Sequence, residues 1–228
     1  MTLRYSDFVD YSKLDPVKRM ALELFEPTLV YPERLGMKII PRTLGQTAVG
    51  FELDGIGDFD FILTGNIEGL GTKNRVSDIM YGQIVAEKLR IANQMHAPGL
   101  YRPTGKDTVA MSVNDQTPLG ADVFAYYDII SSGDSTWFST DEERVRELLM
   151  GYRDAADEGL FAIPQGETPE LRDVVNPDTL DLAGFSNGLI RPKSRLITGE
   201  RIEEGDAIYG LESSGIHANV LTKARRLA

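Results

Sequence analysis

The chain has 228 residues, 42% of them apolar, which is enough for one large domain with a buried core. A formal net charge of −11 disfavours nucleic-acid binding, because a phosphate backbone binds basic surfaces. The lack of cysteine excludes disulfides and thiolate chemistry, and two histidines are too few for a histidine-rich metal site. No apolar stretch is long enough to span a bilayer and no secretion signal is visible, so we expect a cytoplasmic protein without membrane or nucleic-acid partners.

In the first half of the chain, the hydrophobic pattern alternates between helices and strands. Residues 13–25 predict a short helix, and residues 47–53 and 59–65 predict two strands separated by a glycine-rich turn. A long helical pattern covers residues 77–95 and ends before a Pro-Gly pair. The next segment, residues 99–107, superficially resembles a P-loop. Because it has five residues between its glycines and follows a helix, we interpret it as a connecting loop.

The second half begins with residues 109–122, "VAMSVNDQTPLGAD", which are helical in pattern until a proline and a glycine break them. The clearest helix follows at residues 139–159, where Thr140 and Glu143 have capping-box spacing. The remaining predictions are strands at 122–131, 160–168 and 180–190, a polar linker at 193–205, and a strand leading into a helix at 206–228.

These elements predict a mixed α/β (α+β) fold built around a four-stranded mixed sheet. Residues 1–192 are predicted to form one domain, and residues 193–228 a linker with the truncated start of a second domain. A strand and one helix cannot bury their apolar faces alone, so this tail is expected to lack partners. Apolar residues on more than one face of the strands also predict a homodimer.

The glycine-rich stretch "TGNIEGLGTK", residues 64–73, directly follows a predicted strand. Gly69 and Gly71 let the backbone approach an anion closely, and Lys73 supplies a mobile positive charge. Glu68 could hold a metal ion. The alternative is an ordinary glycine-rich turn with a surface lysine.

Other carboxylates could complete a magnesium site. Asp107 and Asp115 are eight residues apart, slightly over two helical turns, so they can share a face if the helix is continuous. With Glu68 and Glu167 they predict an oxygen cage for Mg²⁺ carrying nucleotide phosphates, which would let an acidic protein bind an anion. For Asp115, a solvated helix is the alternative. A second candidate loop of this kind, with a weaker sequence signal, follows another predicted strand at Gly166, Glu167 and Thr168.

The stretch "SSGIHANV" places small residues and backbone N–H groups at the predicted start of a helix, which is one form of anion site. His217 beside them could contact a phosphate or act in proton transfer. A helix cap with a surface histidine is the alternative. The residues concerned are Ser213, Ser214, Gly215 and His217.

Five stretches, in this order, resemble motifs of the aminoimidazole ribonucleotide synthetase (phosphoribosylformylglycinamidine cyclo-ligase) superfamily. They are "EGLGTK", "DTVAMSVNDQTPLGADVFAYYDIISSGD", "QGETPEL", "LDLAGFSNG" and "GDAIYGLESSGIHANVLTKAR". Each motif is weak alone, but the ordered set covers most of the chain from about residue 60 onward.

The resemblance implies an N-terminal ATP-binding and dimerisation domain, whose strands pair with a second copy in a shared β-barrel, with ATP and Mg²⁺ near that interface. The implied enzyme is an ATP-dependent cyclo-ligase of purine biosynthesis. It converts formylglycinamidine ribonucleotide, a small phosphorylated substrate, and ATP to aminoimidazole ribonucleotide, ADP and phosphate.

Residue roles follow by motif match. The metal would be bound by Glu68, Asp107 and Asp115, and the catalytic residues would be Lys73 and His217. ATP would be bound by Gly69, Gly71, Thr72, Lys73, Asn114, Asp115, Gly166, Glu167 and Thr168. The phosphorylated substrate would be bound by Ser213, Ser214, Gly215 and His217.

Departures from the family motifs keep other functions open. Glu68 stands where the family has Asp, and Gln165 replaces the first Gly of a "GGET" turn. Lys73 and Asp107 are separated by about twice the usual spacing. The alternatives are a non-catalytic nucleotide-binding or dimerisation module, and another ATP-dependent phosphoryl-transfer enzyme of the superfamily.

Overall fold

The structure is a computed structural model. It describes residues 20, 24, 26–44, 46–53, 59–87, 97–213, 215, 217–219 and 221. Of the helix predicted at residues 13–25, only Met20 and Leu24 are described, and both are helical. Most of the helix predicted after residue 215 also lies outside the described residues.

A six-stranded mixed sheet forms the centre of the molecule, so the prediction of four strands is wrong. The strand order is β1-β2-β3-β6-β4-β5, and only the β4–β5 pair is parallel. The strand without a sequence prediction, β1, has three residues and lies at an edge of the sheet, where pattern is a weak signal. The strands are β1 (Met37–Ile39), β2 (Val49–Leu53), β3 (Ile62–Gly69), β4 (Asp122–Ser132), β5 (Ala162–Glu167) and β6 (Leu180–Ile190).

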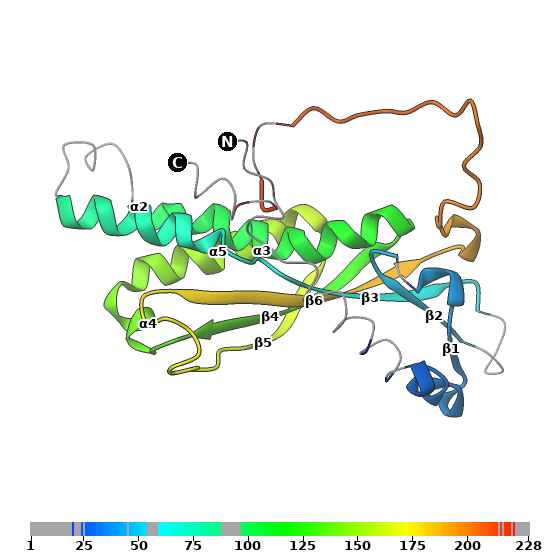
Figure 1. The fold of residues 1–228 in the computed structure, drawn as a ribbon, viewed down its shortest axis with the longest axis horizontal. Helices are drawn as coiled ribbons and strands as arrows, with labels where there is room; N and C mark the ends of the chain where they lie inside the picture. The colour runs from blue at the N-terminus through cyan, green and yellow to red at the C-terminus, as the bar shows by residue number, and fades with distance from the viewer. Residues whose placement is uncertain are drawn as a thin grey trace.

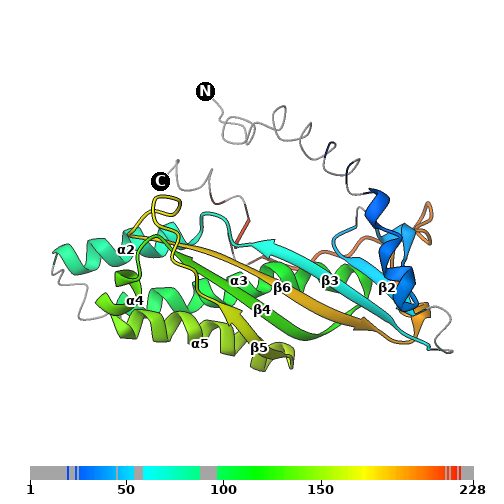
Figure 2. The same cartoon turned by 90° about the horizontal axis from the view of Figure 1, so that it is seen from below.

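The long helices cover one face of this sheet, and no helix of the described residues covers the other, which is called the open face (Figures 1 and 2). Within the described residues the α-helices are α2 (Asn74–Glu87), α3 (Tyr101–Gln116), α4 (Thr136–Thr140) and α5 (Glu142–Gly159). Short 3-10 helices lie between or beyond these elements, at Glu26–Thr28, Tyr31–Leu35, Pro41–Thr43, Ala97–Leu100, Thr117–Leu119 and Lys193–Arg195. No helix in the described part of the chain is long and apolar enough to cross a membrane.

The larger hydrophobic core lies between the sheet and the helices. It includes Val109 of α3, Tyr126 of β4, Leu148 of α5 and Leu182 of β6, each almost fully buried. Along β6 the even-numbered residues are buried and the odd-numbered ones are more exposed, which is the period of two that a one-sided sheet requires.

α3 and α5 cross at two glycines. A Cβ added to Gly105 would run into the backbone carbonyl of Leu148, and one added to Gly151 would run into that of Arg102. Only a residue without a side chain allows the two backbones to approach this closely. The crossing therefore fixes where α3 lies above the sheet.

The beginning and end of α3 differ in how well they were predicted. Residues 101–107, for which the sequence predicts a connecting loop, form the first two turns of the helix. Burial of Tyr101 and Thr104 against the core outweighs the weak helical pattern there. The predicted break is confirmed: Gly120 has φ 82° and its N–H donates to the carbonyl of Thr117.

α5 begins with a different cap from the predicted one. The side chain of Asp141, not of Thr140, accepts hydrogen bonds from the N–H groups of Glu143 and Arg144. Thr140 instead ends α4, and its hydroxyl donates to the carbonyl of Thr136. Thr140, the predicted capping residue, is therefore the last residue of the short helix α4, which the sequence did not predict.

The strand predicted at residues 206–215 is also wrong, since residues 206–213 belong to no strand. Ile208, Tyr209 and Leu211 are at least 92% exposed. A strand needs a neighbour for its ladder of hydrogen bonds, and the described residues provide none here. Farther along, Ala218 packs against the larger core, so the tail returns to the helical side of the sheet.

The helix crossing gives a stability prediction. Gly151→Ala should lower the free energy of unfolding by about 1–3 kcal/mol or more, because the new methyl group overlaps backbone that cannot yield. Thermal denaturation followed by circular dichroism measures this. Gly82→Ala is the matched control, since a Cβ at Gly82 of α2 meets nothing within 4 Å. Equal stability of the two variants would contradict the tight crossing.

Candidate functional site

The predicted acidic residues gather in two places beside the C-terminal half of β3. Glu68 of β3 and Asp115 of α3 form the acidic pair, and Lys73 and Asp107 of α3 form the ion pair. Because residues 101–116 form one helix, Asp107 and Asp115 do belong to a single continuous α3, as the sequence prediction required.

The acidic pair brings two carboxylates together. The pKa of Glu68 is raised above 4.5, first by burial and then by the negative charge of Asp115, while the N–H of Gly69 lowers it. The amide of Asn66 donates to Asp115 Oδ2 at 3.4 Å, and the Thr47 hydroxyl donates to the backbone carbonyl of Asp115 at 2.6 Å. Like charges held this close favour a cation between them.

The ion pair lies at the turn that precedes α2. Lys73 contacts Asp107, and burial lowers the pKa of Lys73. The start of α2 is fixed by Asn74, whose side-chain amide donates to Thr179 Oγ1 at 2.9 Å and to the Leu180 carbonyl at 2.5 Å. Lys73 is therefore held by a carboxylate of its own protein, and a bound phosphate would compete with that carboxylate.

The position of α3 over the sheet is fixed by buried polar residues. These residues were not among the predicted site residues. Ser112 Oγ lies 2.7 Å from Ser186 Oγ and also donates to the Asn66 carbonyl at 3.1 Å. Gln116 donates to the Ser186 carbonyl at 3.0 Å. Their signal in the sequence was the unusual density of polar residues in "SVNDQ", which we assigned only to the site residues.

The residues present fit magnesium only in part. Among the described residues, no group of three or more His, Asp or Glu side chains could hold a metal ion. The predicted ligands are instead divided, because Asp107 contacts Lys73 rather than the acidic pair. Two carboxylates suffice where Mg²⁺ takes its other oxygens from nucleotide phosphates and water. Glu68 and Asp115 therefore fit Mg²⁺ bound together with a phosphate ligand.

Part of the predicted glycine-rich loop belongs to a strand. Residues 64–69 continue β3 and pair with β6 from Gly188 to Ala183, so only residues 70–73 form the turn. The long partner strand β6 provides the ladder that extends β3. As a result Glu68 stands on the strand, whereas Gly71, with φ 70°, lies in the turn.

Glu167 lies far from the acidic pair. In register, Glu167 of β5 pairs with Ile129, which pairs with Ala183, which pairs with Gly69. Glu167 is therefore three strands from β3, roughly 14 Å at the usual strand spacing. Successive residues of a strand point to opposite faces of the sheet, and Gly69 directly follows Glu68. The side chain of Glu167, in the same row as Gly69, therefore points to the face opposite to that of Glu68. Gly166 and Thr168 flank Glu167, so all three lie away from the acidic pair.

Asn114 is exposed on α3, next to Asp115. In the tail, Ser213 Oγ donates to the Gly215 carbonyl at 2.8 Å, and Gly215 has φ 140°, a conformation that favours glycine. His217 is also exposed and precedes Ala218, which packs on the larger core. Ser214 lies outside the described residues. Asn114 thus lies beside the acidic pair, and His217 lies on the helical side of the sheet.

No family model matches the chain. It is 35% identical over 174 residues to a phosphoribosylformylglycinamidine cyclo-ligase of Carboxydothermus hydrogenoformans, covering 76% of this chain and 47% of that protein. The proteins of the same name from Oceanobacillus iheyensis and Symbiobacterium thermophilum are 33% and 34% identical, covering 81% and 82% of this chain and 47% of each protein.

Among solved structures, AaThiL complexed with AMPPCP and TMP aligns with a TM-score of 0.44 and 12% identity, covering 83% of this chain and 44% of that chain. At this score and identity, the similarity supports no inference about ligands. The chain thus spans about half the length of the curated relatives it matches. The resemblance inferred from five ordered motifs is confirmed, and the chain belongs to the superfamily of the phosphoribosylformylglycinamidine cyclo-ligases.

Proposed function

We propose that the chain is the nucleotide-binding part of an ATP-dependent cyclo-ligase of purine biosynthesis. The observation that carries this proposal is the acidic pair, Glu68 and Asp115, in a chain that is similar to proteins named phosphoribosylformylglycinamidine cyclo-ligase. The chain matches about half of those relatives, and we propose that residues 1–192 are the ATP-binding domain and residues 193–228 begin a second domain.

The reaction proposed for the whole protein closes an imidazole ring. The amide oxygen of formylglycinamidine ribonucleotide takes the γ-phosphoryl group of ATP, so that ADP leaves. A nitrogen of the same molecule then attacks the activated carbon and phosphate leaves, giving aminoimidazole ribonucleotide. Bound Mg²⁺ would neutralise phosphate charge during this transfer.

The predicted site residues have distinct roles in this proposal. Glu68 and Asp115 would hold Mg²⁺ together with the phosphates. Lys73 exchanges its contact with Asp107 for a contact with a phosphate oxygen. A lysine ammonium group can bind phosphate as a point charge. Asn114 is exposed beside Asp115 and donates to the nucleotide, and Gly69, Gly71 and Thr72 line its approach. His217 with Ser213, Ser214 and Gly215 serves the phosphorylated substrate.

Gly166, Glu167 and Thr168 require a second copy to take part. They lie on or next to the edge strand β5, and Glu167 points to the open face of the sheet. In a dimer formed through that face, they could contribute to a site that one copy alone does not complete.

A non-catalytic nucleotide-binding module is the second candidate function. It is favoured by the division of the predicted metal ligands, since Asp107 pairs with Lys73 instead of joining the acidic pair. Formation of aminoimidazole ribonucleotide by the whole protein separates the candidates, because a binding module would bind ATP without turnover. A different ATP-dependent phosphoryl transfer would consume ATP without closing the ring.

We also propose that the protein is a homodimer formed through the open face of the sheet. Ile67, Phe185 and Tyr127 lie in one row across β3, β6 and β4, and the rings of Tyr127 and Phe185 are 6.1 Å apart. Ile67 is 68% exposed, and Ile129 in the next row is 40% exposed. A continuous apolar surface of this kind is covered in most proteins, and a second copy presents the same surface.

The first prediction concerns ATP. Calorimetry should detect ATP binding that depends on Mg²⁺. Asp115→Asn should weaken it at least about tenfold, the scale on which loss of partner groups weakens metal sites. Asp157→Asn is the control, because Asp157 lies on the exposed side of α5 in a surface ion pair with Arg153. Binding that is equally strong without Mg²⁺ would contradict the metal assignment.

The second prediction concerns the pKa of Glu68. A carboxyl-detected NMR titration should place it above 4.5, and Asp115→Asn should lower it by removing the neighbouring negative charge. Because the folded-state pKa is raised, the protonated form is favoured on folding. Stability should therefore fall as the pH rises from 4.5 through the raised pKa, and Glu68→Gln should remove this loss. A Glu68 pKa unchanged by Asp115→Asn would show that the carboxylates do not interact.

The third prediction concerns the dimer. Light scattering at micromolar concentration should give twice the mass of one chain. Ile129→Glu should give the monomer mass, since the charge would be buried in the interface. Leu149→Glu is the control, because Leu149 is 49% exposed on α5, on the helical side of the sheet. A monomeric parent protein, or a dimer lost only in the control, would overturn this interface.

A further inference from the structure

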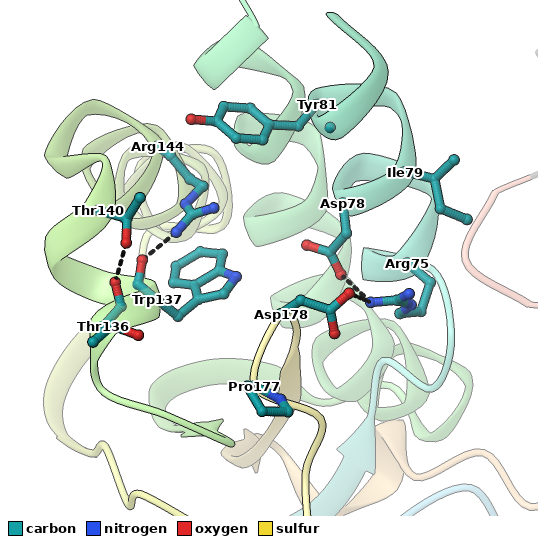
Figure 3. A pocket seen from close by; sticks show the side chains of 11 residues that line it. Arg75, Asp78, Ile79, Tyr81, Thr136, Trp137, Thr140, Arg144, Pro177 and Asp178 are labelled. Carbon is teal, nitrogen blue, oxygen red and sulfur yellow. Dashed lines mark hydrogen bonds and ion pairs between the residues drawn. The ribbon is translucent and has the colours of Figure 1, made fainter. Parts of the chain in front are cut away.

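A cavity beside α4, between α2 and the segment before β6, is lined by carboxylates that already have a cation (Figure 3). Arg75 lies 3.6 Å from Asp78 and 3.3 Å from Asp178. On the other wall, Arg144 packs 4.0 Å from the ring centre of Trp137 and donates to its backbone carbonyl. The negative charges of this cavity are therefore neutralised within the chain, whereas the acidic pair holds like charges together.

The acidic pair is held by a ring of hydrogen bonds that joins three segments of the chain. The side-chain amide of Asn66, on β3, donates to the Thr47 carbonyl at 2.6 Å and to Asp115 Oδ2 at 3.4 Å. The Thr47 hydroxyl closes the ring, since it donates to the Asp115 backbone carbonyl at 2.6 Å. The segment before β2, the strand β3 and the helix α3 are thus tied together beside Asp115.

Asn66 can present its amide to Asp115 in only one orientation. The residue is 9% exposed, and its backbone carbonyl accepts from Ser112 Oγ at 3.1 Å. Within the described part of the chain its side-chain oxygen accepts no hydrogen bond, so the two donor contacts alone set the direction of the amide. Turning the amide over would place that oxygen against the Thr47 carbonyl and the Asp115 carboxylate, which are acceptors as well. The amide N–H groups therefore stay directed at these two residues.

This contact makes the two oxygens of Asp115 unequal. Oδ2 faces the buried amide of Asn66. Glu68 follows Asn66 by two residues on the same face of β3, and its carboxyl group lies within hydrogen-bonding distance of that of Asp115. Both carboxylates are partly exposed, so a cation can reach them from solvent. A metal ion that used both oxygens of Asp115 would compete with the amide hydrogen for Oδ2.

We propose that Asn66 is a specificity-determining residue, which restricts Asp115 to one metal-binding oxygen and thereby selects Mg²⁺ over Ca²⁺. Mg²⁺ requires near-octahedral coordination by oxygens at about 2.1 Å, whereas Ca²⁺ accepts both oxygens of one carboxylate at roughly 2.3–2.6 Å. A carboxylate with one available oxygen therefore favours the smaller ion. This inference rests on the proposed function, since it requires the acidic pair to bind a metal ion together with nucleotide phosphates.

The ratio of two dissociation constants tests the role of Asn66. ATP is titrated into the full chain by calorimetry, once with Mg²⁺ and once with Ca²⁺. The parent chain should bind ATP more tightly with Mg²⁺. Asn66→Ala should reduce this preference about tenfold, the scale on which groups that orient a metal ligand affect metal sites. Loss of folded protein lowers the number of sites and leaves the ratio unchanged, so a merely structural role would not produce this result.

Two further variants separate the amide from the packing around it. Asn66→Leu keeps the approximate size of the side chain and removes its donors, so it should reduce the preference for Mg²⁺ as Asn66→Ala does. Asn187→Ala is the control and should leave the ratio unchanged. Asn187 lies on the neighbouring strand β6 and pairs with Gly65, so its side chain points to the face of the sheet opposite to that of Asn66.

Each outcome bears on one of the two proposals. ATP binding that depends on a divalent cation, with the same ratio in the parent and both Asn66 variants, would overturn the role of Asn66 and leave the nucleotide function standing. A parent chain that prefers Ca²⁺, or an equal change in Asn187→Ala, would also contradict that role. ATP binding by the parent that is independent of both cations would overturn the metal assignment of the proposed function, and the role of Asn66 with it.

Discussion

Short polar side chains and two helical glycines hold α3 in one place above the sheet. Ser112 and Gln116 are fully buried, and both make hydrogen bonds to Ser186 on β6. A bond left unmade in such a network would cost about 1–3 kcal/mol, so the helix cannot slide along the sheet without loss. Asp107 and Asp115 project from this same helix, and their positions therefore depend on the network more than on the surface around them.

The one-sided sheet places two kinds of group in separate environments. Polar and charged side chains of β3 face α3, where burial raises the pKa of Glu68 and keeps Asn66 beside Asp115. Apolar and aromatic side chains of neighbouring rows face outward, where no described element covers them. Successive side chains of β3 point to opposite faces of the sheet, so one face carries the proposed ligand site and the other the proposed dimer surface. A shift of the β3 register by one residue would move each set of side chains to the other face.

The helical layer contains two polar regions of different character. Around the acidic pair, like charges lie together and favour a cation. In the cavity beside α4, an arginine packed on aromatic rings faces carboxylates, so charges of both signs are already present. Because the two regions share no residue, a ligand in one is not required by the chemistry of the other. The turn before α2 carries Lys73 of the ion pair, and the middle of α2 lines the cavity.

The sequence by itself determined the strands β2, β4, β5 and β6, the helix α5 and the superfamily, because hydrophobic period and ordered motifs are local properties. It also singled out Glu68 and Asp115 as candidate ligands, since carboxylates among small or apolar residues are visible without a fold. Tertiary structure alone decided that Glu167 lies across the sheet, that Asp107 pairs with Lys73, and that residues 101–107 are helical. Strand order, register and burial are set by contacts between segments far apart in the chain, and no local pattern contains that information.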